Sequence, residues 1–194
     1  MDAFDVTVCI PSIPPRVKLL QRAITSVLQQ QFPAAGISVC VDKHKEGPAV
    51  VRNRLLAGVQ TPWIAWLDDD DVLYPNHLSV CVQHAERSNA DLVYPWFDVV
   101  GGRDPFPHHF GKPWNPEDPV QTTITTLVRT EALRAVGGFP LPASATDAEG
   151  NRAGEDFLAV LALNAAGCKI EHVAERTWAW HHHARNTSGL TTRW

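Results

Sequence analysis

The feature that most constrains the fold is an alternation of apolar strands and helices over the first hundred residues. The strands are rich in Val, Ile and Trp and are apolar throughout; they are expected at residues 5–11, 36–42, 62–67 and 91–100. The intervening helices carry apolar side chains at helical spacing and are expected at residues 14–32, 48–59 and 75–88. Continuously apolar strands are typical of a parallel sheet that is covered on both faces. We therefore predict an α/β fold with a mostly parallel central sheet and helices on both faces.

The second half of the chain continues this pattern with longer connections. Residues 101–119 are dense in Pro, Gly and aromatic residues and predict a long ordered loop. The remaining elements are expected in this order: a strand, a short helix and a Gly-Gly turn at 121–140, a flexible loop at 141–153, a helix at 154–167, and strands at 168–173 and 176–183. We expect a single domain over residues 1–194.

Composition narrows the function classes. The chain has 194 residues, 44% of them hydrophobic, and a net charge of -4 without a long basic block, which argues against bulk nucleic-acid binding. No apolar run approaches the ~20 residues that cross a bilayer, and the start "MDAFDVTVCI" lacks the basic residues of a signal peptide. We expect a soluble, cytoplasmic chain without a membrane anchor, and leave its oligomeric state open. The four cysteines lack a C-x-x-C pair and are expected to be reduced and buried.

Four consecutive carboxylates, Asp68 to Asp71, follow the buried strand at 62–67. Two such charges about 6 Å apart repel by roughly 2–3 kcal/mol at an effective dielectric constant of ~20, so a compensating charge or water is expected nearby. Ligands of parallel sheets bind at the carboxyl ends of the strands. Ser12 and Asp42 also follow strands, so these polar groups are expected to meet at one edge.

Three interpretations of the aspartates compete. A solvated acidic turn fits poorly behind a buried strand, and a calcium loop would need alternate ligands, a glycine and a distal glutamate. A Mg²⁺ or Mn²⁺ site uses one or two carboxylates and leaves positions open for phosphate oxygens. We favour this third interpretation.

The ordered motifs resemble the GT-A glycosyltransferases of family 2. They are "VTVCIPS", Asp42, "GPAVVRNRLL", "WIAWLDDDDVLYPNHL", "VRTEALRAVGGFP", "GEDF" and "WHHHARNTS", and they span nearly the whole chain. The resemblance implies the Rossmann-like GT-A fold, with a nucleotide-binding half at 1–100 and an acceptor-binding and catalytic half at 101–194. It also implies an inverting transfer of a sugar from a nucleotide-diphosphate sugar, with UDP-sugar as the expected donor.

The resemblance assigns roles residue by residue. The residues expected to contact the donor are Pro11, Ser12, Asp42, Arg52, Asn53, Asp68 and Asp69. Asp70 matches the metal-binding acid of the D-x-D motif, with Mn²⁺ or Mg²⁺ as its ion, and Asp71 is expected to cap the following turn. Glu155 and Asp156 match the acid pair that supplies the general base. We favour Asp156, which the positive end of a helix is expected to keep ionised.

The terminal histidines are the further metal-ligand candidates. His181 and His183 share one face of the expected strand, and His182 points away. His183 takes the histidine position of the family pattern, whereas His181 stands where arginine is usual, so which of the two is a ligand stays open.

The acceptor is the least determined part of the reaction. The chain is similar to small glycosyltransferases of bacteriophages and actinobacteria, which suggests either a hydroxymethylated DNA base or a glycan. The expected basic rim consists of Arg16, Lys18, Lys43, His44 and Lys45. The alternatives are a nucleotidyltransferase, although "IPSIPPR" lacks its Gly-rich loop, a non-catalytic sugar-nucleotide or metal-binding module, and a metal-dependent hydrolase.

Overall fold

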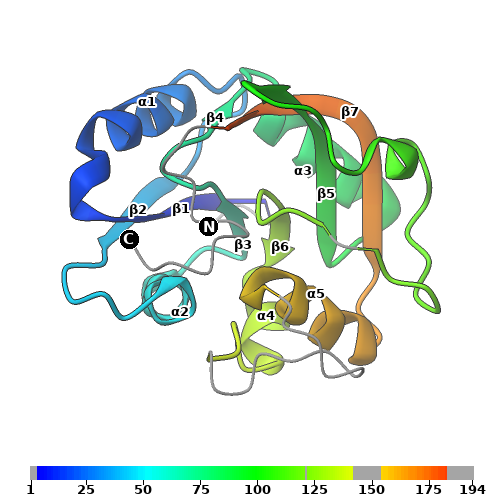
Figure 1. Cartoon of the computed structure of the whole chain (residues 1–194). Helices are drawn as coiled ribbons and strands as arrows, with labels where there is room; N and C mark the ends of the chain where they lie inside the picture. The colour runs from blue at the N-terminus through cyan, green and yellow to red at the C-terminus, as the bar shows by residue number, and fades with distance from the viewer. Residues whose placement is uncertain (1–3, 121, 142–153, 183–194) are drawn as a thin grey trace.

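A computed structural model describes residues 4–120, 122–141 and 154–182, and these form a seven-stranded sheet between two groups of helices (Figure 1). The strand order is β2-β1-β3-β6-β5-β7-β4. The strands are β1 (Val6–Ser12), β2 (Gly36–Val41), β3 (Trp63–Trp66), β4 (Val72–Leu73), β5 (Leu92–Val100), β6 (Leu127–Arg129) and β7 (Ile170–His181).

The sheet is mixed, but five of its seven strands run in one direction. β1 pairs in parallel with β2 and β3, and β5 pairs in parallel with β7. β6 lies antiparallel between β3 and β5, and β4 is antiparallel to β7. The predicted α/β class with a mostly parallel sheet is therefore confirmed, and strands from both halves of the chain share one sheet.

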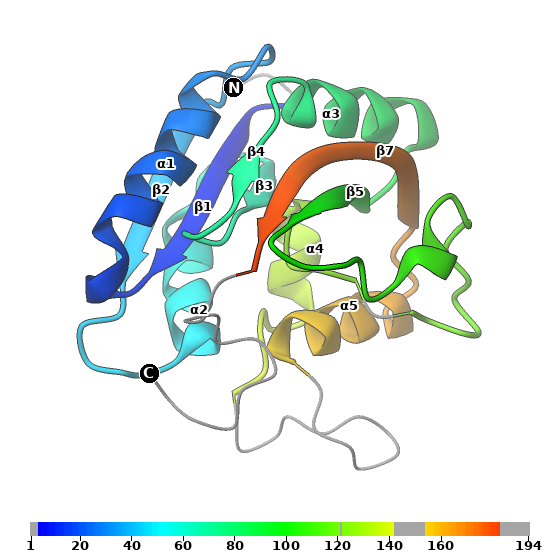
Figure 2. The same ribbon diagram turned by 45° about the horizontal axis from the view of Figure 1, so that its top comes forward.

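The helices form two groups. They are α1 (Val17–Leu28), α2 (Pro48–Gly58), α3 (His77–Ser88), α4 (Thr130–Ala135) and α5 (Glu155–Ala165), with short 3₁₀ turns η1 (Pro14–Arg16) and η2 (Pro107–His109). α1 and α3 lie on one side of the sheet, and α2, α4 and α5 lie on the other (Figures 1 and 2). The predicted covering of both faces is confirmed.

Helix α1 is shorter at both ends than its sequence pattern predicts. Pro14, Pro15 and Arg16 form the η1 turn, and the helix stops at Leu28 instead of continuing to Phe32. The side chain of Gln30 donates a hydrogen bond to Tyr74 O at 2.7 Å and accepts one from Leu78 N at 2.9 Å. These bonds join the end of α1 to the start of α3, so tertiary contacts end the helix.

The C-terminal strands also differ from the prediction. Residues 168–173 and 176–183 were expected as separate strands, whereas β7 is continuous from Ile170 to His181 with irregular register opposite Trp96. Such irregularities bend a strand without ending its pairing. β4 was not predicted, because two residues carry no periodicity; Val72 pairs with Ala179 and Leu73 with Trp178. His183 lies outside the described residues.

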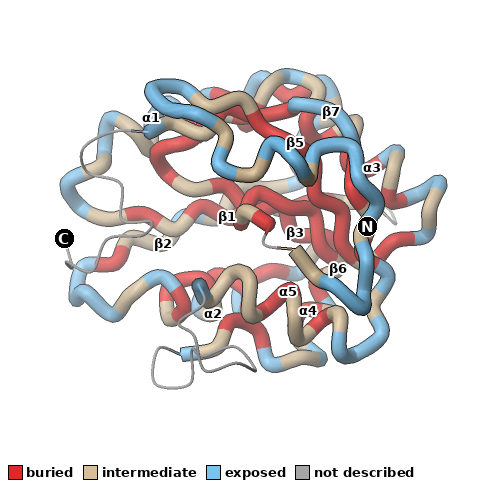
Figure 3. The backbone as a smooth tube through the Cα atoms, turned by 45° about the vertical axis from the view of Figure 1, so that its right-hand side comes forward, coloured by how far each residue is buried: buried red, intermediate tan, exposed pale blue. Residues whose placement is uncertain are grey.

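The core fills the space between the sheet and its helices, where the buried residues, coloured red, are concentrated (Figure 3). Trp63, Trp66 and Trp178 are among its largest buried side chains. The long loop at 101–119 is held to this core as expected: the Trp96 indole donates to Asp104 at 2.7 Å, and Gly111 N donates to His172 Nε2 at 3.0 Å. Among the described residues, no helix combines the length and apolar character needed to cross a bilayer.

The cysteines have free thiols, as expected. Cys9 and Cys81 are fully buried, and Cys40 and Cys168 are partly exposed, so the prediction of complete burial holds for two of the four. The predicted loop at 141–153 lies outside the described residues apart from Leu141.

Candidate active site

Four acids at the end of β3 and two at the start of α5 form the candidate site. Strand β3 ends at Trp66, and the chain then turns, with Asp71 N donating a hydrogen bond to Asp68 O at 3.2 Å. This turn directs neighbouring carboxylates to different partners. Asp69, Asp70 and Asp71 are buried, whereas Asp68 keeps a third of its side chain exposed.

Asp69 and Asp70 share one arginine from the η1 turn as their counter-ion. Arg16 Nη1 lies 2.9 Å from Asp69 Oδ1 and 2.9 Å from Asp70 Oδ2. The Ser12 hydroxyl also donates to Asp69 Oδ2 at 2.6 Å. Burial raises the pKa of Asp69 despite these bonds. Arg16 was expected on a basic rim near the nucleotide edge; its side chain is only 10% exposed and faces the acids, so it does not contribute to an exposed basic surface.

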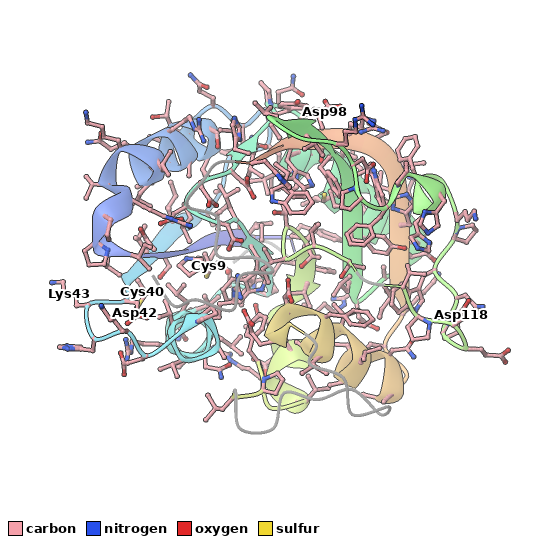
Figure 4. The ribbon with its side chains drawn as sticks, in the orientation of Figure 1. Cys9, Cys40, Asp42, Lys43, Asp98 and Asp118 are labelled. Atoms are coloured by element: carbon pink, nitrogen blue, oxygen red, sulfur yellow. The ribbon has the colours of Figure 1, made fainter. Side chains whose placement is uncertain are left out.

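The other four residues of the expected basic rim lie on the surface. Lys18, Lys43, His44 and Lys45 are exposed. Figure 4 shows Lys43 pointing away from the protein at the loop between β2 and α2. That these four residues form one basic rim stays a prediction.

Arg52 connects the aspartates to the start of α5. Its guanidinium is buried and donates to Asp68 Oδ1 at 2.9 Å and to Glu155 Oε1. Burial alone would lower the pKa of Arg52, but Asp68 and Glu155 together raise it, so the group stays charged. The side chain therefore spans the distance between two acidic motifs that are far apart in sequence. Sequence reasoning expected Arg52 at the donor and did not anticipate its bond to Glu155.

Asp71 joins a cluster that could hold a cation. Ligand oxygens of Asp68, Asp70 and Asp71 lie within 4.8 Å of one another. Burial raises the pKa of Asp71 well above its usual value, and the charges of Asp68 and Asp70 raise it further. Asp71 was expected to cap the following turn; instead its carboxylate accepts a hydrogen bond from His181 N at 2.8 Å, which attaches it to the end of β7.

The histidines contribute differently from one another. The His181 backbone binds Asp71, and its ring Nδ1 lies 3.2 Å from Ala179 O. Among the described residues, the three-acid cluster does not include His181. His182 packs against Trp180, with ring centroids 4.6 Å apart. His183 lies outside the described residues, so its role as a ligand stays a prediction.

Asp156 has the environment of a general base. It lies in the first turn of α5, where its Oδ1 accepts a hydrogen bond from Phe157 N at 2.8 Å. Burial raises its pKa to about 6; Arg52 opposes this shift and Glu155 adds to it. The hydrogen bond from Phe157 N at the helix end lowers the pKa, and the loss of hydration outweighs it, but a carboxyl with a pKa of about 6 is still ionised at neutral pH. A base with a pKa near the working pH is the more effective one.

The other expected donor contacts are engaged with the backbone. Asp42 accepts hydrogen bonds from Glu46 N and Gly47 N at 2.9 Å each. Burial tends to raise its pKa, but these donors outweigh burial and lower it. The Asn53 side chain donates to Phe139 O at 2.7 Å and accepts from Phe139 N at 2.8 Å, so it holds the Gly-Gly turn. Pro11 lies beside Cys40 in the paired strands.

Comparison with known proteins places this site in a family context. A family model described as "Glycosyl transferase family 2" matches residues 26–137, more than half of the chain. The match includes Arg52 and the four aspartates and ends before Asp156. The succinoglycan biosynthesis protein ExoW of Rhizobium meliloti (strain 1021) is 29% identical over 133 residues, which are 55% of this chain and 41% of that protein. This chain therefore spans less than half of that relative.

Solved structures show a similar fold. Residues 1–349 of TarS from S. aureus, in complex with UDP-GlcNAc, superpose with a TM-score of 0.77 at 15% identity, over 94% of this chain and 60% of that one. The complex of the same protein with UDP gives a TM-score of 0.72 at 15% identity, over 92% and 60% of the two chains. At this identity the likeness establishes the fold.

Proposed function

Because the chain belongs to glycosyl transferase family 2, we propose that it transfers a sugar from a nucleotide-diphosphate sugar to an acceptor hydroxyl. The observation that carries this proposal is Arg52, which joins Asp68 of the aspartate turn to Glu155 beside Asp156. Arg52 thereby joins an acid proposed for the donor to the neighbour of the proposed base. A nucleotidyltransferase or a binding module would not need this second acid pair.

The carboxylate ligands of the aspartate turn suit Mn²⁺ or Mg²⁺. Asp68, Asp70 and Asp71 supply carboxylate oxygens within 4.8 Å of one another, and both ions prefer oxygen ligands. Burial and then the charges of Asp68 and Asp70 raise the pKa of Asp71, and a cation at this point would offset those charges. A bound divalent ion would stabilise the negative charge that develops on the departing diphosphate. Asp70 and Asp71 would hold the ion, and Asp68 would face the donor sugar and ribose.

The acid pair supplies the proton transfer. The acceptor oxygen attacks C1 of the sugar, the bond from C1 to the diphosphate oxygen breaks, and the nucleoside diphosphate leaves. Asp156 takes the acceptor proton as this happens. Because the acceptor oxygen attacks C1 in one step on the side opposite the departing diphosphate, the configuration at C1 is inverted. Glu155 holds Arg52 and, through it, Asp68. Its contact with Arg52 supports a positioning role.

For the donor, we propose a UDP-sugar. The similar TarS structures contain UDP-GlcNAc or UDP, and the described residues share their fold. Ser12 and Asp42 at the ends of β1 and β2 are proposed at the nucleotide, in the half formed by residues 1–100. The buried Asp42 orders the loop from Lys43 to Gly47, whose backbone would border the base.

For the acceptor, we propose a glycan hydroxyl in the half formed by residues 101–194. The relative ExoW is named for succinoglycan biosynthesis, which supports a saccharide acceptor. A hydroxymethylated DNA base is the second candidate, supported by the exposed Lys18, Lys43, His44 and Lys45. The inward orientation of Arg16 weakens that candidate.

The proposal is tested by mass spectrometry of products across a panel of UDP-sugars, offered with glycans and with hydroxymethylated DNA. We expect one added hexose-type mass on a glycan, lost in Asp156→Asn. Transfer to DNA alone would replace the proposed acceptor. Transfer of a nucleotidyl group, or donor binding without any transfer, would contradict the proposed reaction.

A further inference from the structure

Arg16 pairs with Asp70, one of the proposed metal ligands, so an incoming metal ion would compete with it for that carboxylate. One nitrogen, Nη1, lies 2.9 Å from both Asp69 Oδ1 and Asp70 Oδ2. Both carboxylates are buried, with side-chain exposures of 3% and 8%. The guanidinium is therefore the resident counter-ion of two acids that are largely shielded from water.

The three acids of the cluster have different protein partners. Asp68 pairs with Arg52, which is itself held by Glu155, and Asp71 accepts the His181 N–H. Asp70 pairs with Arg16. A divalent ion that takes Asp70 as a ligand would lie beside the guanidinium of Arg16. Neighbouring positive charges repel strongly where little water screens them.

A diphosphate would offset the repulsion between Arg16 and the metal ion, because its negative charge attracts both. Its oxygens would accept hydrogen bonds from a guanidinium in the planar arrangement that arginine favours. They would also ligate the cation. The negative charge that the donor brings therefore stabilises both cations at once, whereas the free metal ion competes with Arg16 for Asp70.

We propose that Arg16 is a displaceable counter-ion that keeps the affinity for free divalent cations low until the nucleotide diphosphate binds. The inference rests on the proposed function, because it takes Asp70 as a metal ligand. Its consequence is that cation and donor bind with positive coupling, each raising the affinity for the other by the same factor. Arg16 thus acts as a positioning residue for Asp70 in the free protein.

The test measures Mn²⁺ binding to the whole chain by electron paramagnetic resonance of the free ion, with and without saturating UDP. We expect UDP to tighten Mn²⁺ binding to the wild type by about tenfold or more, within the usual range of coupling between sites. Arg16→Gln should bind Mn²⁺ alone about tenfold more tightly than the wild type, and UDP should then add less. No sugar transfer is needed for this readout.

Two further variants separate charge from position. Arg16→Lys keeps the positive charge, so its affinity for Mn²⁺ alone should stay within about threefold of the wild type. Arg54→Gln is the matched control: it removes one positive charge from an exposed pair with Glu46, and should leave Mn²⁺ binding unchanged. Circular dichroism and thermal melting establish that each variant is folded.

The outcomes distinguish the inference from the proposed function. If Arg16→Gln binds Mn²⁺ alone no more tightly than the wild type, while UDP still tightens Mn²⁺ binding, the inference is overturned and the metal-dependent function stands. If Mn²⁺ binds no variant even with UDP, both are overturned. Should Arg16→Gln not fold, the wild type decides, because equal Mn²⁺ affinity with and without UDP would overturn the inference.

Discussion

At the residue scale, Glu155 and Asp156 are neighbours with different surroundings. Glu155 is paired with Arg52, whereas Asp156 has a pKa raised to about 6, chiefly by burial. The contact with Arg52 occupies the Glu155 carboxylate. A carboxylate that has lost hydration holds a proton more readily. These environments separate a positioning role for Glu155 from a base role for Asp156.

Asp156→Asn should therefore lower kcat by about 10²–10⁴-fold, the usual contribution of general-base catalysis. The affinity for UDP-sugar should stay nearly unchanged, because the base acts on the acceptor proton in the transition state. Calorimetric donor binding and transfer rates measure the two effects separately.

Glu155→Gln is the comparison variant for this prediction. It weakens the hold on Arg52, so it should reduce donor affinity more than Asp156→Asn does. If Asp156→Asn transfers sugar at the wild-type rate while Glu155→Gln does not, the base is Glu155. Normal transfer by both would make this acid pair structural.

The pKa of Asp156 also predicts the pH profile. The base acts only when deprotonated, and burial moves its titration from the usual 3.8 up to about 6. Activity should thus be lost as pH falls through about 6, with kcat/KM dropping about tenfold per pH unit below it. The residual activity of Asp156→Asn should not show this fall in kcat/KM at low pH. A wild-type rate that stays constant down to pH 4.5 would be evidence against Asp156 as the base.

At the element scale, helix α2 holds two parts of the site through consecutive residues. Arg52 reaches Asp68 and Glu155, and Asn53 binds the backbone of Phe139. Phe139 in turn packs edge-on against Trp66 at the end of β3, with centroids 5.0 Å apart. The Gly-Gly turn is thus fixed between α2 and the sheet.

The two glycines of this turn offer a matched test. Gly137 (φ 84°) and Gly138 (φ 75°) both adopt the left-handed conformation, which costs other residues about 1–2 kcal/mol. A Cβ on Gly138 would lie 2.4 Å from Asn53 Oδ1, whereas one on Gly137 would contact nothing within 4 Å. Gly138→Ala should therefore lower the free energy of unfolding by about 1–3 kcal/mol more than Gly137→Ala, because it also breaks the Asn53 bonds.

Urea denaturation of both variants measures this difference. Gly138→Ala should also raise the acceptor KM, while donor affinity changes less. Equal destabilisation by the two substitutions would show that Asn53 tolerates displacement and that the turn is held by other contacts.

At the scale of the whole molecule, one continuous sheet brings both halves of the chain to the same site. β6 from the second half lies between β3 and β5 of the first, and β7 reaches back to β4. The aspartate turn is contacted by side chains from η1, α1 and α2 and by the end of β7. Arg16, Arg52 and the His181 backbone reach it from three directions.

The acidic charge of the aspartate turn predicts that activity depends strictly on a divalent ion. Arg16 and Arg52 compensate part of the acidic charge, but Asp71 lies next to Asp68 and Asp70 with its pKa raised well above the usual value. Chelation should abolish transfer, and Mn²⁺ or Mg²⁺ should restore it. Asp70→Asn should lower metal-dependent donor binding by at least about tenfold, the lower range for changes at metal ligands. Full activity after exhaustive chelation would contradict the prediction.

The sequence by itself determined the order and type of most elements and the position of the acids among them. Apolar periodicity is a local property, so β1, β2, β3 and β5 could be predicted from it, and a parallel sheet brings the ends of its strands to one edge. The four aspartates could be placed there for that reason. The family resemblance added the roles of Asp70 and Asp156, which no periodicity indicates.

Only the tertiary structure decided which cation meets which acid. Arg16 is 53 positions from Asp69, and Arg52 is 103 positions from Glu155. Such pairings depend on strand order and on how each turn directs its side chains, and no local pattern encodes either. The same holds for the end of α1 at Leu28, for the two-residue strand β4 and for the pKa of Asp156. Each is set by groups that become neighbours when the chain folds, because burial and charge act through space and not along the sequence.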